Sequence, residues 1–150
     1  MSEKWDARFL GQAELVAGWS KDPSTKVGAV IVDALNRVVS QGFNGFAKSI
    51  KDTRARLSDR AKKYPMVIHA ELNAILFAQR SLRGCTIYIW PMPPCASCAG
   101  PLIQVGITRV VSVPPTAEHI DRWGDSYALA QEMFREAGVT VSHCVGDNPE

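Results

Sequence analysis

Two short segments, 69–71 and 94–98, constrain this chain more than any other feature. They read His-Ala-Glu and Pro-Cys-Ala-Ser-Cys, and they offer one imidazole and two thiols, from His69, Cys95 and Cys98. Imidazole and thiolate ligands suit zinc, and three protein ligands leave the fourth tetrahedral position open for water. A neutral histidine and two thiolates cancel the double charge of the ion, which still polarises water toward hydroxide near neutral pH. The pattern predicts one zinc ion in a catalytic site.

Glu71 makes this predicted metal site a predicted reaction centre. It lies two residues from a ligand and is not needed as a ligand itself. A carboxylate there can take a proton from the metal-bound water and pass it to a ring nitrogen and then to the leaving amine. Hydroxide attack at C4 of a cytosine ring, followed by loss of ammonia, needs only these groups. The two segments match the H-x-E and P-C-x-x-C signature of zinc nucleobase deaminases, and we predict hydrolytic deamination.

Each part of the pattern has a simpler explanation when it is taken alone. The Cys95–Cys98 pair could be a redox pair or half of a structural zinc site, and His69 could be an ordinary histidine. A redox pair does not account for His69 and Glu71, and a structural site needs a fourth ligand. The other candidate ligands show no second metal-binding spacing: Cys85, Cys144, His119 and His143. We therefore favour the catalytic interpretation.

Helical spacing places both segments at the starts of helices. Residues 70–79 carry apolar side chains at helical intervals, so His69 and Glu71 lie near a helix start. Pro94 precedes a second predicted helix, 95–104, whose first turn holds both cysteines on one face. Two helix N-termini that face one metal favour thiolates and bound hydroxide.

The remaining pattern predicts one α/β domain over residues 1–150, a length that fits a single core. Apolar runs rich in β-branched residues predict strands at 27–33, 38–43, 85–90, 108–113 and 139–143, and periodicity predicts further helices at 3–19 and 125–137. The order of elements predicts a three-layer α/β/α fold with a five-stranded mixed sheet. We expect the metal at one edge of this sheet, where the two helices begin.

Charge and hydropathy bear on the partners. The net charge of +2 does not indicate the strongly basic surface that binds nucleic acid, so we expect no nucleic-acid partner. No apolar run approaches the ~20 residues that span a bilayer, and the N-terminal residues lack the apolar core of a signal peptide, so we expect a cytoplasmic enzyme. The basic segment 46–64 contains only Asp52 and Asp59 as acids. It either solvates a surface loop or contacts a phosphate or an effector nucleotide.

Beyond the two segments, the chain resembles the cytidine deaminase superfamily and, within it, the deoxycytidylate deaminases, from about Trp19 to Val141. The similar stretches are 20–23 (SKDP), 27–32 (VGAVIV), 42–45 (GFNG), 67–75 (VIHAELNAI), 94–99 (PCASCA), 103–107 (IQVGI) and 137–141 (AGVTV). The resemblance implies zinc at the three ligands, with Glu71 as the proton shuttle. It implies conversion of dCMP to dUMP and ammonia, a step of pyrimidine nucleotide metabolism.

The resemblance also implies substrate contacts and partners. Asn44 is either a turn residue that tolerates left-handed backbone or an amide that binds a sugar hydroxyl, and the resemblance implies the second role. Trp90 either flanks the base or belongs to the core, and we also expect contacts from Ala70, Lys26 and Phe43. Members of the family are homo-oligomers, commonly hexamers, and many are activated by dCTP and inhibited by dTTP. The family's usual G-Y-N-G-x-P reads GFNGFA at 42–47 here.

Two alternatives are a deaminase of another cytosine nucleotide and a tRNA adenosine deaminase, which shares H-A-E and P-C-x-x-C-A-G. Against the second stand the 42–45 motif, the long 45–68 segment and the weak net charge. A tRNA-binding protein typically carries a basic patch, often toward its C-terminus, whereas this chain ends in GDNPE at 146–150. A non-catalytic zinc or nucleotide-binding module would not need Glu71.

Overall fold

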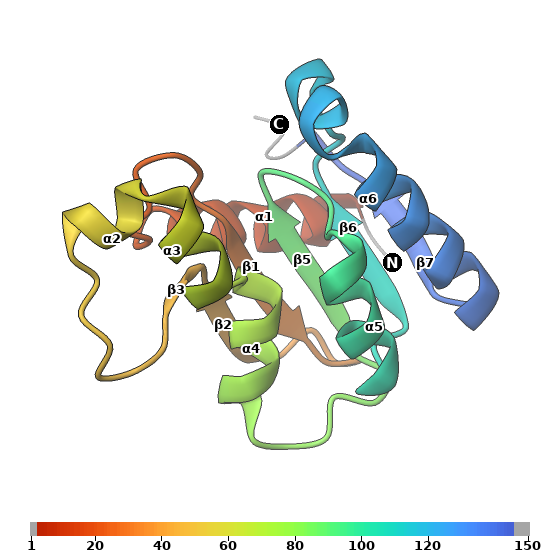
Figure 1. The fold of residues 1–150 in the computed structure, drawn as a ribbon. Coiled ribbons are helices and arrows are strands. Elements are labelled where there is room, and N and C mark those ends of the chain that lie inside the picture. Colours follow the sequence, from red (N-terminus) through yellow and green to blue (C-terminus); the bar gives the residue numbers. More distant parts are fainter. Residues whose placement is uncertain (1–2, 146–150) are drawn as a thin grey trace.

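The computed structural model describes residues 3–145 and has the predicted architecture, a mixed five-stranded sheet with helices on both faces (Figure 1). Residues 1–2 and 146–150, and with them the acidic C-terminal end considered above, lie outside the described part. The strand order is β2-β1-β5-β6-β7. The strands are β1 (Gly28–Val32), β2 (Val38–Phe43), β5 (Thr86–Trp90), β6 (Arg109–Ser112) and β7 (Thr140–His143). Strand β1 is antiparallel to β2 and β5, whereas β5, β6 and β7 are parallel.

The helices form the two outer layers. Helix α1 (Glu3–Ala17) covers one face, and α4 (Ala70–Ala78), α5 (Ala96–Gln104) and α6 (Ala117–Ala137) lie on the other, with α6 packed against α5 (Figure 1). Successive residues of β1 alternate between two apolar cores. Val30 and Val32 pack with α1, whereas Ala29 and Ile31 pack with α4 and α5. Both faces of β1 are buried, which explains why its sequence is a continuous apolar run.

Helix α1 approaches the sheet closely at Gly28. A Cβ atom at this position would lie 2.1 Å from the carbonyl oxygen of Ala13 and 2.5 Å from the amide nitrogen of Ala17. Such distances exclude any side chain, so the glycine is required for this close approach. The predicted helix over 3–19 and the first strand are therefore held together backbone to backbone.

Two parts of the chain differ from the sequence prediction. Helix α6 begins at residue 117 rather than 125, because Thr116 and His119 form a capping box in which each side chain accepts a hydrogen bond from the other residue's backbone N–H. The basic segment forms two short helices, α2 (Arg54–Ser58) and α3 (Arg60–Met66), rather than a loop with one helix. A small second sheet, β3 (Gly45–Phe46) with β4 (Val67–Ile68), closes this segment at its base.

Neither a membrane span nor a disulfide is found within residues 3–145. None of the described helices combines the length and the apolar character that a bilayer crossing requires. All four cysteines of the chain are free thiols. The two that are not predicted metal ligands, Cys85 and Cys144, belong to opposite sides of the sheet.

Candidate active site

The three predicted metal ligands meet at the N-terminal ends of α4 and α5. His69 is the N-cap residue of α4, Cys95 is that of α5, and Cys98 follows in the first turn of α5. The Nδ1 atom of His69 lies 3.5 Å from Sγ of Cys95 and 3.3 Å from Sγ of Cys98. All three ligand atoms lie within 4.8 Å of one another. Because α5 follows β5, the cluster lies beyond the end of the central strand and not beside an edge strand.

Close packing at α4 and a capping hydrogen bond from another helix at α5 hold these helix ends in place. A Cβ atom at Gly42 of β2 would lie 2.5 Å from the amide nitrogen of Ala74 in α4, so only glycine permits the observed approach. At α5, the backbone N–H of Ala96 donates to Oγ of Ser126 in α6 at 3.0 Å. Ser126 thus supplies the cap that the Cys95 side chain does not provide, and the Cys95 sulfur remains available to the cluster.

The pKa shifts of the two cysteines and the histidine fit a metal site. The hydrogen bond with Cys98 lowers the pKa of Cys95 to about 4, against the opposing effect of burial and with help from His69. The same bond, together with burial, raises the pKa of Cys98, and a hydrogen bond with Cys95 raises the pKa of His69. A thiolate, a thiol and an imidazole therefore converge at one point, where a divalent cation can displace the protons. The donor set and its spacing fit zinc.

Glu71 lies beside the cluster without belonging to it. It is in the first turn of α4, its side chain is 4% exposed, and it lines a cavity next to the ligands. Burial raises the pKa of its carboxyl group. A buried carboxylate beside three metal ligands is placed to hold a proton and to move it between groups in the cavity.

The cavity has a volume of about 410 Å³, within the range of small-molecule binding sites. Its walls come from loop 22–27, from the first turns of α4 and α5, and from helices α3 and α6. Two of the predicted substrate contacts, Asn44 and Ala70, line it. Asn44 is not among the non-glycine residues with positive φ in the described chain, so it is not the left-handed turn residue of the alternative interpretation.

The structure does not bring Lys26, Phe43 and Trp90 to this cavity. The Lys26 ammonium group donates a hydrogen bond to the carbonyl oxygen of Ser20. The Phe43 ring lies edge-on to that of Trp19, with ring centres 6.3 Å apart. Trp90 packs against the core on the α1 side of the sheet, because strand side chains alternate and Tyr88 already faces that side. Trp90 is thus a partly buried neighbour of this core, and these three residues are not part of the substrate contacts that we propose below.

Cationic and aromatic side chains also line the cavity. The sequence singled out none of them, although it left open that basic residues of segment 46–64 contact a phosphate. Helices α3 and α6 supply them: Arg60, Lys63, Tyr64, Arg122, Trp123 and Tyr127. The Tyr127 hydroxyl donates to Sδ of Met92 at 3.0 Å, and burial raises the pKa of Tyr127 to about 12. For α6 the capping box at Thr116 was an available signal. For α3 the charge run alone did not indicate which side chains turn inward.

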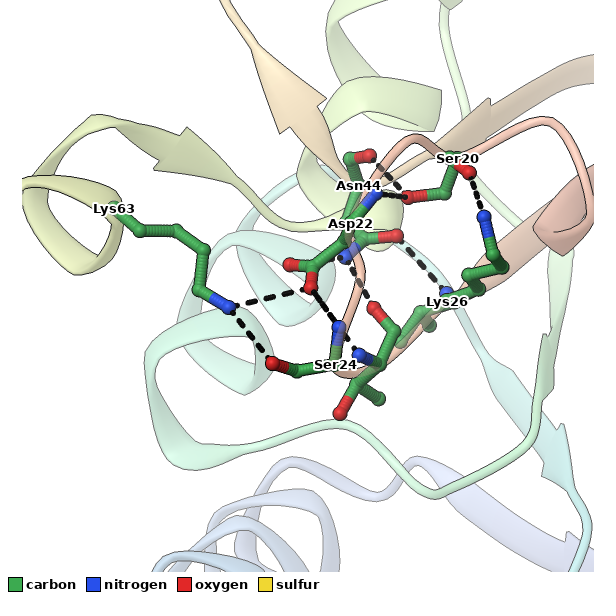
Figure 2. A network of polar contacts seen from close by, with 8 residues as sticks. Ser20, Asp22, Ser24, Lys26, Asn44 and Lys63 are labelled. Carbon is green, nitrogen blue, oxygen red and sulfur yellow. Dashed lines mark hydrogen bonds and ion pairs between the residues drawn. The ribbon is translucent and has the colours of Figure 1, made fainter. Parts of the chain in front are cut away.

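A buried polar network joins the cavity wall to Asn44, as Figure 2 shows. The Asn44 side chain accepts a hydrogen bond from the Val27 N–H at 2.9 Å and donates to the Thr25 carbonyl oxygen at 2.9 Å. Its second donor contact is with the Asp22 carboxylate at 3.5 Å. Asp22 in turn pairs with Lys63 of α3 at 3.2 Å. The loop that carries the SKDP sequence is therefore bonded both to Asn44 and to the basic segment.

Comparison with known proteins agrees with this geometry. Residues 3–113 match the cytidine and deoxycytidylate deaminase zinc-binding region. The chain is 48% identical over 142 residues to an uncharacterized deaminase in the luxG 3' region of Aliivibrio fischeri, covering 95% of each chain. It is 37% identical over 145 residues to the deoxycytidylate deaminase of Homo sapiens, covering 91% of this chain and 78% of that protein.

A solved structure shares the fold. The dCMP deaminase of cyanophage S-TIM5, in complex with dCMP and dUMP, superposes with a TM-score of 0.74 at 22% identity, covering 94% of this chain and 97% of that one. The fold and the His-Cys-Cys cluster define a zinc-dependent deaminase, a hydrolase that acts on cyclic amidines. The chain belongs to the cytidine and deoxycytidylate deaminase family.

Proposed function

We propose that this protein hydrolyses dCMP to dUMP and ammonia. The observation that carries the proposal is that one cavity is lined by the metal ligands His69 and Cys95, by the buried residue Glu71, and by Arg60 and Arg122. No ion pair involves either arginine within residues 3–145. Guanidinium groups without a carboxylate partner are suited to the phosphate of a nucleotide. Likeness to the human deoxycytidylate deaminase supports the same substrate.

Chemistry is divided between the metal site and Glu71. When bound by His69, Cys95 and Cys98, zinc supplies a Lewis acid that makes water nucleophilic near neutral pH. Glu71 accepts a proton from the attacking water, delivers it to N3 of the cytosine ring and later helps to protonate the departing amine. The ring gains oxygen at C4 and loses its amino group, so that dCMP and water give dUMP and ammonia.

Recognition of the nucleotide is assigned to the other walls of the cavity. We assign the 5'-phosphate to Arg60 and Arg122, which present charge from two different helices. We assign the deoxyribose to Asn44, whose buried amide lines the same cavity. Ala70, between His69 and Glu71, offers its backbone to the base at the point where the reaction takes place.

The proposal is tested by ammonia release from zinc-loaded protein. The substrates are dCMP, CMP, dCTP, deoxycytidine and an anticodon stem-loop with a reactive adenosine. We expect the highest kcat/KM for dCMP. The variants Arg60→Met and Arg122→Met should lose much of the preference for dCMP over deoxycytidine, because that preference depends on the phosphate.

Lys62→Met is the matched control, because Lys62 is an exposed residue of α3 outside the cavity. It should keep the preference of the wild type. Equal rates on dCMP and deoxycytidine in the wild type would contradict the phosphate assignment. Activity on the stem-loop alone would overturn the proposal in favour of a tRNA adenosine deaminase.

Assembly and regulation stay predictions. We propose a homo-oligomer, with a hexamer expected, and control by dCTP and dTTP. Large apolar side chains on the outer side of α4 support a contact between copies: Leu76 is 55% exposed and Phe77 is 53% exposed. Light scattering gives the mass of the assembly. Rate curves for dCMP with and without dCTP or dTTP test the control, and curves that both nucleotides leave unchanged would contradict it.

A further inference from the structure

An ion pair between Asp22 and Lys63 connects the loop before β1 to helix α3 across the cavity wall (Figure 2). The Lys63 ammonium group donates to Oδ1 of Asp22 at 3.2 Å and to Oγ of Ser24 at 3.4 Å. Both charged side chains are only 7% exposed. Burial of an ammonium group is unfavourable unless its partners compensate for the lost hydration. The contacts with Asp22 and Ser24 provide that compensation in the cavity wall.

The Asp22 carboxylate is committed to protein groups. Besides Lys63, its Oδ1 atom accepts the backbone N–H groups of Ser24 at 2.8 Å and Thr25 at 3.2 Å. Its Oδ2 atom accepts from Nδ2 of Asn44 at 3.5 Å. With these four donors around it, Asp22 has little capacity left for a ligand, and its effect on the cavity passes through Asn44.

The hydrogen-bond partners of Asn44 determine the orientation of its side-chain amide. Its Oδ1 atom faces a donor, the Val27 N–H, and its two Nδ2 hydrogens face two acceptors, the Thr25 carbonyl oxygen and Asp22. The amide is therefore fixed in one orientation with both donors used. The one capacity left to it is the second lone pair of Oδ1, which can only accept. A hydroxyl group of a sugar is a matching donor.

We infer that Lys63 and Asp22 are positioning residues that hold Asn44 ready to accept a hydrogen bond from a deoxyribose hydroxyl. The inference rests on the proposed function and deepens it, because it makes sugar recognition depend on helix α3. Lys63 holds the Asp22 carboxylate in place, and Asp22 holds the Asn44 amide.

Removal of Lys63 should act first on the contact between Asp22 and Asn44. That contact is the longest of the network at 3.5 Å, and its acceptor would lose its charged partner and keep only the two backbone donors beside Asn44. Such a carboxylate attracts water from the adjoining cavity, and this water weakens its hold on Nδ2. Asn44 would then sample several orientations, and the sugar hydroxyl would lose its partner in part of the population.

The test measures binding without turnover. Calorimetry on the zinc-loaded protein gives dissociation constants for dUMP, for 2',3'-dideoxy-UMP, which lacks the sugar hydroxyl, and for deoxyuridine, which lacks the phosphate. For Lys63→Met we expect dUMP to bind about tenfold more weakly, the loss of one oriented hydrogen bond. The dideoxy ligand should bind both proteins equally, whereas deoxyuridine should show the same tenfold loss. Lys62→Met, the same substitution at the exposed neighbour, should bind all three ligands as the wild type does.

A second variant keeps the test decisive if Lys63→Met folds poorly. Asp22→Asn removes the charge. Its amide oxygen would stay with the donors that Oδ1 of Asp22 accepts from, and its amide nitrogen would then face Nδ2 of Asn44, which needs an acceptor. The variant should therefore give the same pattern across the three ligands. The double variant should bind dUMP no more weakly than the worse single variant, because both act through Asn44.

Two results would overturn the inference alone. An equal loss on dUMP and the dideoxy ligand would show that Lys63 does not act through the sugar hydroxyl. A loss that disappears with deoxyuridine would make Lys63 a ligand of the phosphate instead. A wild-type protein that neither binds dUMP nor deaminates dCMP would overturn the proposed function and this inference together.

Discussion

Asp6 and Asp22 each form an ion pair whose basic partner is also largely buried, and the surroundings of the two pairs differ. Asp6 of α1 accepts two hydrogen bonds from Arg109, at 2.6 and 2.8 Å, and one from the Tyr88 hydroxyl at 2.8 Å. Asp22 accepts its charged partner through one contact with Lys63 at 3.2 Å. The first pair lies between α1 and the sheet, whereas the second lines the candidate active site.

The difference separates a structural role from a functional one. A bidentate arginine pair with short hydrogen bonds fixes two elements rigidly, and here it fastens α1 to β5 and β6. A lysine pair with longer contacts leaves its groups room to move, and the adjoining cavity lets water reach them if the pair is broken. Asp6 should therefore matter mainly for stability, and Asp22 with Lys63 mainly for ligand binding.

The largest effect is expected for Asp6→Ala. The change leaves the Arg109 guanidinium, only 17% exposed, without its carboxylate partner. The free energy of unfolding should fall by about 3–5 kcal/mol, the usual cost of breaking a buried pair from one side. Denaturant unfolding measures the fall. The dissociation constant for dUMP should not change in the folded protein. A large change would contradict the proposal that the Asp6 pair serves stability and the Asp22 pair serves ligand binding.

A smaller loss of stability is expected for Lys63→Met. Asp22 keeps two backbone donors, and the cavity can admit water to its carboxylate. The free energy of unfolding should fall by about 1–2 kcal/mol. The same denaturant measurement applies. A fall as large as that of Asp6→Ala would mean that the cavity-side pair is structural as well.

The pH dependence of stability sharpens the comparison further. Burial alone would raise the pKa of Asp6, but hydrogen bonds from Arg109 and Tyr88 outweigh it and lower the pKa below 3.8. The unfolded chain therefore binds the proton more readily, and the stabilisation from Asp6 is present above about pH 4 and lost as the pH falls through the folded pKa.

The matched variant is Asp6→Asn, which cannot titrate. The difference in unfolding free energy between wild type and variant should be constant near neutral pH and should shrink below pH 3.8. Loss of zinc at low pH affects both proteins alike and cancels in the difference. A difference that grows as the pH falls would contradict the lowered pKa.

The smallest effect is expected at an exposed pair. Lys21 and Asp52 lie 3.1 Å apart, with side chains 71% and 42% exposed. Solvent and salt screen such a contact, so Lys21→Met should leave the unfolding midpoint unchanged within error. A measurable shift of the unfolding midpoint would show that this exposed pair also stabilises the protein, so that burial would not be what separates the ion pairs.

The metal ligands and the sheet could be predicted from the sequence because local patterns specify them. His69 and Glu71 lie at one helix start, Cys95 and Cys98 at another, and the apolar runs mark strands that are buried on both faces. The apolar spacing predicts a helix only from 125, whereas α6 begins at 117, after the capping box of Thr116 and His119.

The cavity walls could not be predicted in the same way. Lys63 meets Asp22 across 41 residues of sequence, and Ser126 caps α5 across 30. No periodicity links such positions, and the charge run around Lys63 gives no sign that this lysine is buried while its neighbour Lys62 is exposed. The packing of α3 and α6 around the cluster decides which of their side chains line the cavity.

The most direct test of the central claim compares wild type with Glu71→Gln. Zinc per chain and dUMP formed from dCMP are measured in the same preparations. We expect both proteins to bind one zinc ion per chain, and the variant to form dUMP about 10²–10⁴-fold more slowly, because glutamine cannot carry the proton. A variant with full zinc and a rate close to that of the wild type would contradict the account, as would a zinc-loaded wild type that leaves dCMP unchanged.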